Sequence, residues 1–152
     1  MKISNYSISV VIPTHNDFSQ LLFVIRSVND QEYKPKEIII VDSSDDDLIN
    51  NFVNEYSGLI PINYYKVKSA YPGKARNIGV YKANEEWIAF LDTKTIPKKY
   101  WLKNYVHYIK NNKCNLIFGF TQYEAKSLKQ KIIRAATIGL VGHETTPGPL
   151  IR

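Results

Sequence analysis

Three strongly apolar segments occupy residues 8–12, 37–41 and 87–91, and each of them ends at polar side chains. Segments that are almost wholly apolar, as these are apart from Ser9 and Glu37, are typical of strands covered on both faces, as in a parallel sheet. In an open parallel sheet, ligands bind beyond the carboxyl ends of the strands, where the strand order reverses. If the three segments are neighbouring parallel strands, their polar ends form a single site.

Helical and strand patterns alternate along the rest of the chain. Apolar residues recur at helical spacing from Phe18 to Val28, after Asp17 and Gln20, whose spacing is that of a capping box. The expected strands are 8–12, 37–41, 62–67, 87–92 and 115–120, and the expected helices are 18–28, 45–56, 75–84, 97–110 and 128–140. This order predicts an α/β fold with right-handed crossovers, in which helices sandwich a mostly parallel, Rossmann-like sheet.

The length of 152 residues fits a single domain, 1–152, that can bury a substantial core. Residues 142–152 are rich in Gly, Pro and Thr and show no periodicity, so we expect an irregular tail. The one cysteine excludes an intramolecular disulfide and fits a reducing compartment. No signal peptide and no segment of about 18 apolar residues is recognisable, so we expect a cytoplasmic protein.

The formal net charge of +6 favours an anionic partner. Residues 93–113 hold six lysines and no carboxylate, together with aromatic residues such as Tyr100 and Tyr108. Such a stretch could hold the protein at the inner face of an anionic membrane, as a peripheral association. Single-stranded nucleic acid would use similar chemistry but is the less favoured partner. An amphipathic helix with solvated lysines explains the same pattern.

Two common phosphate-binding loops are absent. No G-x-G-x-x-G follows the first expected strand, and no G-x-x-x-x-G-K-[ST] occurs anywhere, although residues 73–75 form a fragment of such a loop. These absences argue against a dinucleotide-binding Rossmann domain and against a P-loop nucleoside triphosphatase.

Four motifs, in order and spacing, instead resemble family 2 glycosyltransferases, which have the A-type (GT-A) fold. The motifs are SVVIPTHN (9–16), EIIIVDSSD (37–45), GKARNIG (73–79) and FLDTKTIP (90–97). The resemblance covers about residues 7 to 113. It implies a nucleotide-sugar-binding domain and the transfer of a sugar, from a UDP-sugar donor in particular, to a glycan or lipid-linked acceptor with inversion.

The resemblance also assigns roles to the first two strand ends. Pro13, Thr14 and Asn16 would line the pocket for the base and ribose, with His15 as pocket wall. Asp42 would accept a hydrogen bond from the base, usually from the uracil ring N–H, because a carboxylate only accepts and charge-assisted bonds are strong. Each residue also has a plainer explanation, since Asp42 could simply end its strand.

The third and fourth motifs supply charged groups. Lys74 and Arg76 would approach the nucleotide, and the forked donors of an arginine suit a phosphate or a base edge. Asp92 corresponds to the first aspartate of the D-x-D motif, which serves the ribose or a metal ion. The plainer interpretations are a solvated cation for Arg76 and a turn residue for Asp92.

Lys94 stands where the family has its second D-x-D aspartate, which contacts Mn²⁺ or Mg²⁺. A protonated lysine cannot be a metal ligand, and hard divalent ions need oxygen ligands. Asp92 is therefore a tentative metal ligand only, and a metal cofactor is doubtful. Three interpretations stay open: Lys94 replaces the metal at the diphosphate, the site is degenerate, or Lys94 faces solvent and another carboxylate binds the metal.

The resemblance also implies that the sequence stops before the acceptor half of the family. An inverting transfer needs a carboxylate base within hydrogen-bond reach of the acceptor hydroxyl. Downstream of Lys113 the carboxylates are Glu124 and Glu144, and Glu144, beside His143, is the weak candidate. Two functions therefore remain open: a glycosyltransferase, or a non-catalytic or degenerate nucleotide-sugar-binding module.

Overall fold

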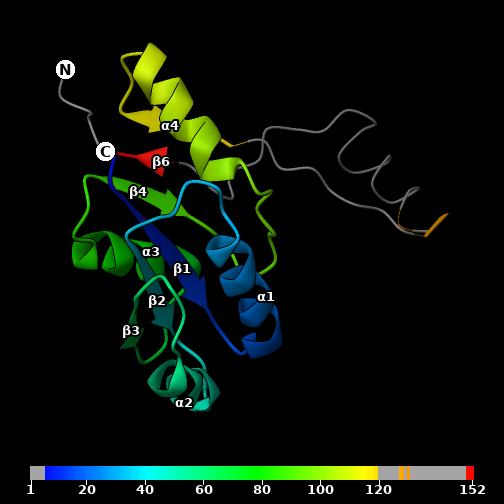
Figure 1. The fold of residues 1–152 in the computed structure, drawn as a ribbon. Coiled ribbons are helices and arrows are strands. Elements are labelled where there is room, and N and C mark those ends of the chain that lie inside the picture. The colour runs from blue at the N-terminus through cyan, green and yellow to red at the C-terminus, as the bar shows by residue number, and fades with distance from the viewer. Residues whose placement is uncertain (1–5, 120–126, 129, 131–149) are drawn as a thin grey trace.

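The computed structural model describes residues 6–119, 127–128, 130 and 150–152 (Figure 1). In this part of the chain, six strands form one sheet in the order β3-β2-β1-β4-β6-β5. The strands are β1 (Ile8–Thr14), β2 (Glu37–Asp42), β3 (Ile62–Lys66), β4 (Trp87–Phe90), β5 (Leu116–Ile117) and β6 (Leu150–Ile151). The helices are α1 (Phe18–Asn29), α2 (Leu48–Glu55), α3 (Pro72–Lys82) and α4 (Trp101–Asn111).

Strand β1 lies between two parallel neighbours. Its residues Ser9 to Thr14 pair with Glu37 to Asp42 of β2, and on the other side it pairs with β4. Strand β2 pairs in parallel with β3. Every residue of β1, β2 and β4 is buried, as expected for strands covered on both faces. The predicted α/β fold with a mostly parallel sheet is confirmed, and the carboxyl ends of β1, β2 and β4 meet at one edge.

The helices cover both faces of the sheet, and a core lies on each face. Strand β1 contributes alternate side chains to the two cores. Val10 and Ile12 belong to a cluster that includes residues of α1, α2 and α4. Val11 belongs to a second cluster on the other face, with Ala75 of α3. Among the described residues, no helix combines the length and the apolar composition needed to cross a membrane.

The edge of the sheet formed by β6 and β5 differs from the prediction. Leu150–Ile151 form β6, antiparallel to both β4 and β5, so the irregular tail expected at 142–152 is wrong for these two residues. Strand β5 covers Leu116–Ile117 rather than 115–120. The reason is that β6 is specified by the open edge of β4, where Leu150 becomes fully buried, and not by any periodicity of its own. Residues 142–149 lie outside the described part.

Two helices begin later in the structure than the sequence predicts. Helix α2 begins at Leu48 rather than at 45, and α4 begins at Trp101 rather than at 97. Asp17 makes no capping hydrogen bond to α1, so the predicted capping box is wrong. Its carboxylate instead accepts a hydrogen bond from the Thr93 hydroxyl at 2.8 Å, which is a long-range contact that no local pattern encodes. The helix expected at 128–140 lies almost wholly outside the described residues.

A buried carboxylate fixes the amino end of the sheet. Glu37 accepts hydrogen bonds from the Ser9 hydroxyl at 2.6 Å, from the Asn63 amide at 2.6 Å, and from the backbone and side chain of Asn84 at 2.8 and 2.9 Å. Burial alone would raise the pKa of Glu37, but these donors outweigh it and hold the pKa below its usual value. The carboxylate thus joins β1, β2, β3 and the end of α3.

We expect the substitution Gly79→Ala to destabilise the fold. Helix α3 approaches β1 so closely that a Cβ on Gly79 would lie 2.2 Å from Cγ1 of Val11. Overpacking of this kind costs about 1–3 kcal/mol, which exceeds the gain of up to ~1 kcal/mol from helix propensity. The free energy of unfolding in urea measures the difference. The matched control is Gly73→Ala in the same helix, where a Cβ meets nothing within 4 Å, and we expect no loss of stability there. Equal effects in the two variants would contradict the expectation.

Candidate functional site

A cavity of about 1580 Å³ opens at the carboxyl ends of β1 and β4. Its wall is built from the β1 end (Pro13 to His15) together with Asp17 and Ser43, from residues 69–72, 75 and 76 at the start of α3, and from residues 91–98 after β4. The first residues of α4 and the segment after β5 complete it. Its position is the one that the strand-end rule predicts.

The structure brings together some of the predicted site residues and leaves others outside. Those that line the cavity are Pro13, Thr14, Arg76, Asp92 and Lys94. Asn16, Asp42 and Lys74 are not part of its wall. The roles in nucleotide binding stay predictions for all eight residues, but the geometry now separates them into two groups.

The Thr14 side chain lies in the cavity wall with an unpartnered hydroxyl whose oxygen has less than 1 Å² of exposed surface, so a ligand would reach it only after a small movement of the wall. It is 5% exposed, it lines the cavity, and its hydroxyl has no hydrogen-bond partner among the described residues. A buried hydroxyl without a partner costs free energy. A ligand that offers a hydrogen-bonding group at this wall would remove that cost.

Two charged side chains of the cavity neutralise each other. Arg76 donates from Nη2 to Oδ1 of Asp92 at 2.5 Å, and the two side chains are 31% and 35% exposed. Lys94 is exposed in the same cavity and has no ion-pair partner within the described part of the chain. The cavity wall therefore retains an uncompensated cation, which suits a phosphate-bearing ligand.

The wall does not fit a divalent metal ion held by protein ligands. Hard ions need several oxygen ligands, but Asp92 is engaged by Arg76, and the ammonium of Lys94 is two residues away in the sequence. Among residues 6–119 and the few described beyond them, no three His, Cys, Asp or Glu side chains form a metal-binding group. The predicted metal role of Asp92 stays doubtful for this physical reason.

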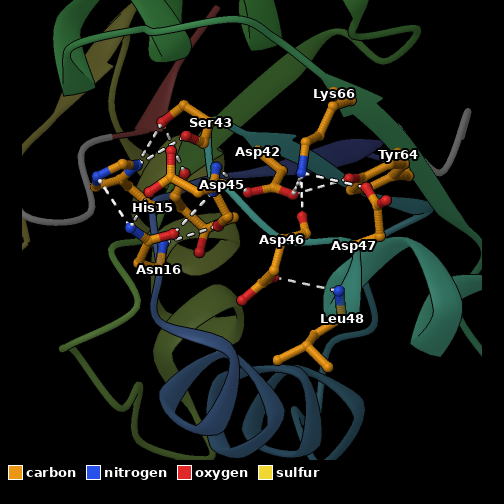
Figure 2. Close-up of polar contacts among 12 residues, drawn as sticks. His15, Asn16, Asp42, Ser43, Asp45, Asp46, Asp47, Leu48, Tyr64 and Lys66 are labelled. Atoms are coloured by element: carbon orange, nitrogen blue, oxygen red, sulfur yellow. Dashed lines mark hydrogen bonds and ion pairs between the residues drawn. The ribbon is translucent and has the colours of Figure 1, made fainter.

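The loops after β1 and β2 are tied together by hydrogen bonds (Figure 2). The backbone N–H of Ser43 donates to the backbone oxygen of Thr14 at 3.0 Å, and Nδ1 of the His15 ring donates to the backbone oxygen of Ser43 at 2.8 Å. The side-chain amide of Asn16 donates to the Asp45 carboxylate at 2.8 Å and accepts from the backbone N–H of Asp45 at 3.0 Å. Asn16 has a φ of 50°, a left-handed conformation that asparagine tolerates. In this structure Asn16 thus connects the loop after β1 to the loop after β2.

Asp42 is fully buried and its oxygens are already in use. Oδ2 accepts from the Tyr64 hydroxyl at 2.8 Å and from Lys66 at 3.5 Å, and Oδ1 accepts from the backbone of Ser44 at 2.8 Å. Burial and the hydrogen bond to Asp42 raise the pKa of Tyr64, which keeps this hydroxyl a donor. A base could reach Asp42 only after Tyr64 or Lys66 moved.

Sequence reasoning missed several wall residues. Asp17 and Thr93 line the cavity and are hydrogen-bonded to each other. The aromatic side chains of Tyr71 and Trp101 also line it. Extending the strand-end rule a few residues beyond each strand would have found Asp17 and Thr93, whereas nothing in the sequence marks the aromatic residues. The candidate base Glu144, with Glu124 and His143, lies outside the described residues.

Comparison with known proteins gives consistent results. A profile described as Glycosyl transferase family 2 matches residues 9–140. An uncharacterized glycosyltransferase of Rickettsia conorii is 30% identical over 145 residues, covering 95% of this chain and 24% of the relative. The poly(ribitol-phosphate) beta-N-acetylglucosaminyltransferase TarP of Staphylococcus aureus is 32% identical over 123 residues, covering 78% of this chain and 38% of TarP. The chain thus spans well under half the length of each relative.

Solved structures share the fold. Residues 1–349 of S. aureus TarS, in complex with UDP-GlcNAc, match with a TM-score of 0.70 at 23% identity, covering 96% of this chain and 45% of that one. A mannosyltransferase from Pyrobaculum calidifontis, in complex with GDP-Man and Mn²⁺, matches with a TM-score of 0.68 at 17% identity, covering 97% and 45%. These matches confirm the expected GT-A fold.

We expect Thr14→Val to leave the ligand-free protein as stable as the wild type or stabilise it by up to about 1 kcal/mol, because the lost hydroxyl has no partner. The matched control is Thr93→Val, which removes a buried hydroxyl that donates to Asp17 and should cost about 1 kcal/mol. Urea unfolding measures both. A clear loss of stability in Thr14→Val would show that this hydroxyl has a partner within the protein.

Proposed function

The chain belongs to glycosyl transferase family 2, and we propose that the cavity beyond β1 and β4 binds a nucleotide-diphosphate sugar, with UDP as the nucleotide. The observation behind this proposal is that one cavity wall holds two groups without a partner among the described residues. They are the buried hydroxyl of Thr14 and the ammonium of Lys94. A diphosphate offers negative charge to the cation, and a base or ribose offers a partner to the hydroxyl. The complex of TarS with UDP-GlcNAc supports the choice of UDP.

The proposed reaction is transfer of the sugar to a glycan or lipid-linked acceptor with inversion. An acceptor hydroxyl oxygen attacks the anomeric carbon, the bond to the diphosphate breaks, and a carboxylate takes the hydroxyl proton. Glu144 remains the candidate for that base. Lys94 would stabilise the charge that develops on the leaving diphosphate. The poly(ribitol-phosphate) acceptor in the name of TarP supports a cell-envelope polymer as the acceptor class.

A non-catalytic nucleotide-sugar-binding module is the second candidate. The observation that favours it is that Arg76 engages Asp92 while a lysine stands in place of the second D-x-D carboxylate. Both features weaken the binding of a metal ion that would bridge the diphosphate to the protein. They leave a cationic cavity that can hold a nucleotide. The two candidates share binding and differ in turnover.

We expect UDP binding to depend little on a divalent metal. Isothermal titration of UDP in Mn²⁺ and then in EDTA should give dissociation constants within about threefold, a difference below 1 kcal/mol. The variant Lys94→Asp should bind more weakly in EDTA and recover with Mn²⁺, because it restores an oxygen ligand beside Asp92. The control Lys36→Asp makes the same charge change at an exposed residue outside the cavity and should show no such recovery. A large loss of wild-type affinity on chelation would contradict metal independence.

Turnover separates the enzyme from the binding module. We expect UDP release from UDP-GlcNAc to rise above hydrolysis in buffer only when an acceptor polymer is present. Lys94→Ala should lower this rate by about tenfold or more while affinity for the donor falls less, since stabilisation of a developing charge acts mainly on the transition state. Tight binding of UDP-GlcNAc without release, across acceptors that include poly(ribitol-phosphate), would identify the module instead.

A further inference from the structure

The cavity is larger than a nucleotide-sugar donor needs. Its volume of about 1580 Å³ exceeds the roughly 300–1,000 Å³ that is typical of small-molecule sites. The residues proposed to meet the donor, such as Arg76 and Lys94, come from α3 and from the ends of β1 and β4. A second part of the wall is formed by Lys98 and by Trp101 and Asn104 of α4. This second part has no role in the proposed binding of the donor.

Lys98 is a cation held at a fixed place in this second part of the wall. The fully buried amide of Gln31 donates to the backbone oxygen of Lys98 at 2.9 Å and accepts from the backbone N–H of Leu102 at 3.3 Å. The Lys98 side chain is exposed and has no ion-pair partner among the described residues. Asp17, which lines the same cavity, accepts the Thr93 hydroxyl and forms no ion pair with Lys98. The ammonium of Lys98 is therefore free to meet an anionic group.

Helix α4 extends this part of the wall as a stripe of aromatic and amide side chains. Trp101, Asn104 and Tyr105 line the cavity, and Tyr108 follows them at the spacing of residues on one helix face. The stripe is about 10 Å long. The side chain of Asn104 is exposed and has no hydrogen-bond partner within the described part of the chain. Aromatic rings can pack against the C–H groups of a polyol or sugar, and a free amide can bond its hydroxyls.

We propose that Lys98 and the α4 stripe bind the acceptor, and that the acceptor is a polyol or glycan chain with anionic groups along it. This inference rests on the proposed sugar transfer. Residues 93–113 hold six lysines and no carboxylate, and among the described residues only Lys103 of these six has an ion-pair partner, Glu32 at 2.7 Å. The field of this surface attracts a polyanion. Lys98 pairs with one anionic group of the chain, while the stripe holds the neighbouring units.

The same surface fits a membrane less well. A helix that lies in a membrane interface inserts an apolar face among the lipids. Helix α4 buries its aliphatic residues Leu102, Val106 and Ile109 in the protein core. Its exposed residues are polar or are tyrosines, and Tyr108 is 49% exposed. Such a surface suits a hydrated polymer.

Isothermal titration with poly(ribitol-phosphate) as the anionic probe, and with dextran as the neutral polymer, tests the proposal. The wild type should bind the anionic probe about tenfold or more tightly than dextran. Lys98→Gln should weaken binding of the anionic probe by about tenfold, because it removes one charged contact, and should change the dissociation constant of UDP by less than about threefold. The matched control is Lys99→Gln, since Lys99 is exposed and adjacent but does not line the cavity, and we expect a change below about twofold. Chondroitin, a polymer whose anionic groups include carboxylates, shows whether the Lys98-dependent contact is with phosphate or with carboxylate.

Chain length tests the stripe. Tyr108→Ala should weaken binding of poly(ribitol-phosphate) by about fivefold and leave binding of a single ribitol phosphate unit unchanged, because Tyr108 lies beyond the cavity-lining residues. The control is Tyr100→Ala, which removes a tyrosine that is also 49% exposed but does not line the cavity and has Lys103 over its ring. Thermal unfolding checks that each variant is folded.

Three outcomes would overturn the proposal. Equal affinity of the wild type for dextran and for the anionic polymers, or equal effects of Lys98→Gln and Lys99→Gln, would do so and would leave UDP binding intact. Binding to phosphatidylglycerol vesicles without binding to either anionic polymer would assign the surface to a membrane instead. Absence of UDP binding in the wild type would overturn the proposed function, and with it the assignment of the polymer as acceptor.

Discussion

The hydrogen-bonded position of β1 between β2 and β4 is the constraint on which the rest of the structure depends. Because both pairings are parallel, three strands deliver their carboxyl ends to one edge of the sheet. Every residue of β1 is buried and its side chains alternate between two cores, so a one-residue shift in register would exchange the side chains that face the two cores. The cavity is therefore placed by the pairing itself, and the loops only decide which groups line it.

The two edges of this sheet treat polar groups in opposite ways. At the amino end, the Glu37 carboxylate receives four hydrogen bonds and has no capacity left for a ligand. At the carboxyl end, the Thr14 hydroxyl and the Lys94 ammonium have no partner among the described residues. The contrast holds for these groups and not for the whole edges, because Nε1 of Trp87, the first residue of β4, also has no partner among the described residues, and Asp42 at the carboxyl end is fully hydrogen-bonded. A saturated carboxylate stabilises the fold, whereas an unpartnered cation in the cavity wall keeps its capacity for a ligand.

The parts of the fold that could be predicted from sequence are those with a long local signal. The strands 8–12 and 37–41 are apolar runs, and α1 has clear helical periodicity, so each was identified close to its observed bounds. Strand β6 has two residues and is specified by the edge of β4. The burial of Asp42 depends on Tyr64 and Lys66, which reach it only because β3 pairs with β2 in one particular register. Neither property can be predicted without knowing which strands are neighbours.

The aspartates that end β2 and follow β4 show why equivalent sequence positions acquired different roles. Asp42 faces Tyr64 and Lys66 of β3, which enclose it, whereas Asp92 faces Arg76 of α3 and stays partly exposed. Each carboxylate thus has a basic partner from a neighbouring element, and neither contributes free negative charge to the edge. Among the described residues of the cavity wall, Lys94, Lys98 and Asp17 have no ion-pair partner, which leaves one more cation than anion. This balance favours an anionic ligand, because the two strand-end carboxylates that would have repelled a diphosphate are already neutralised within the protein.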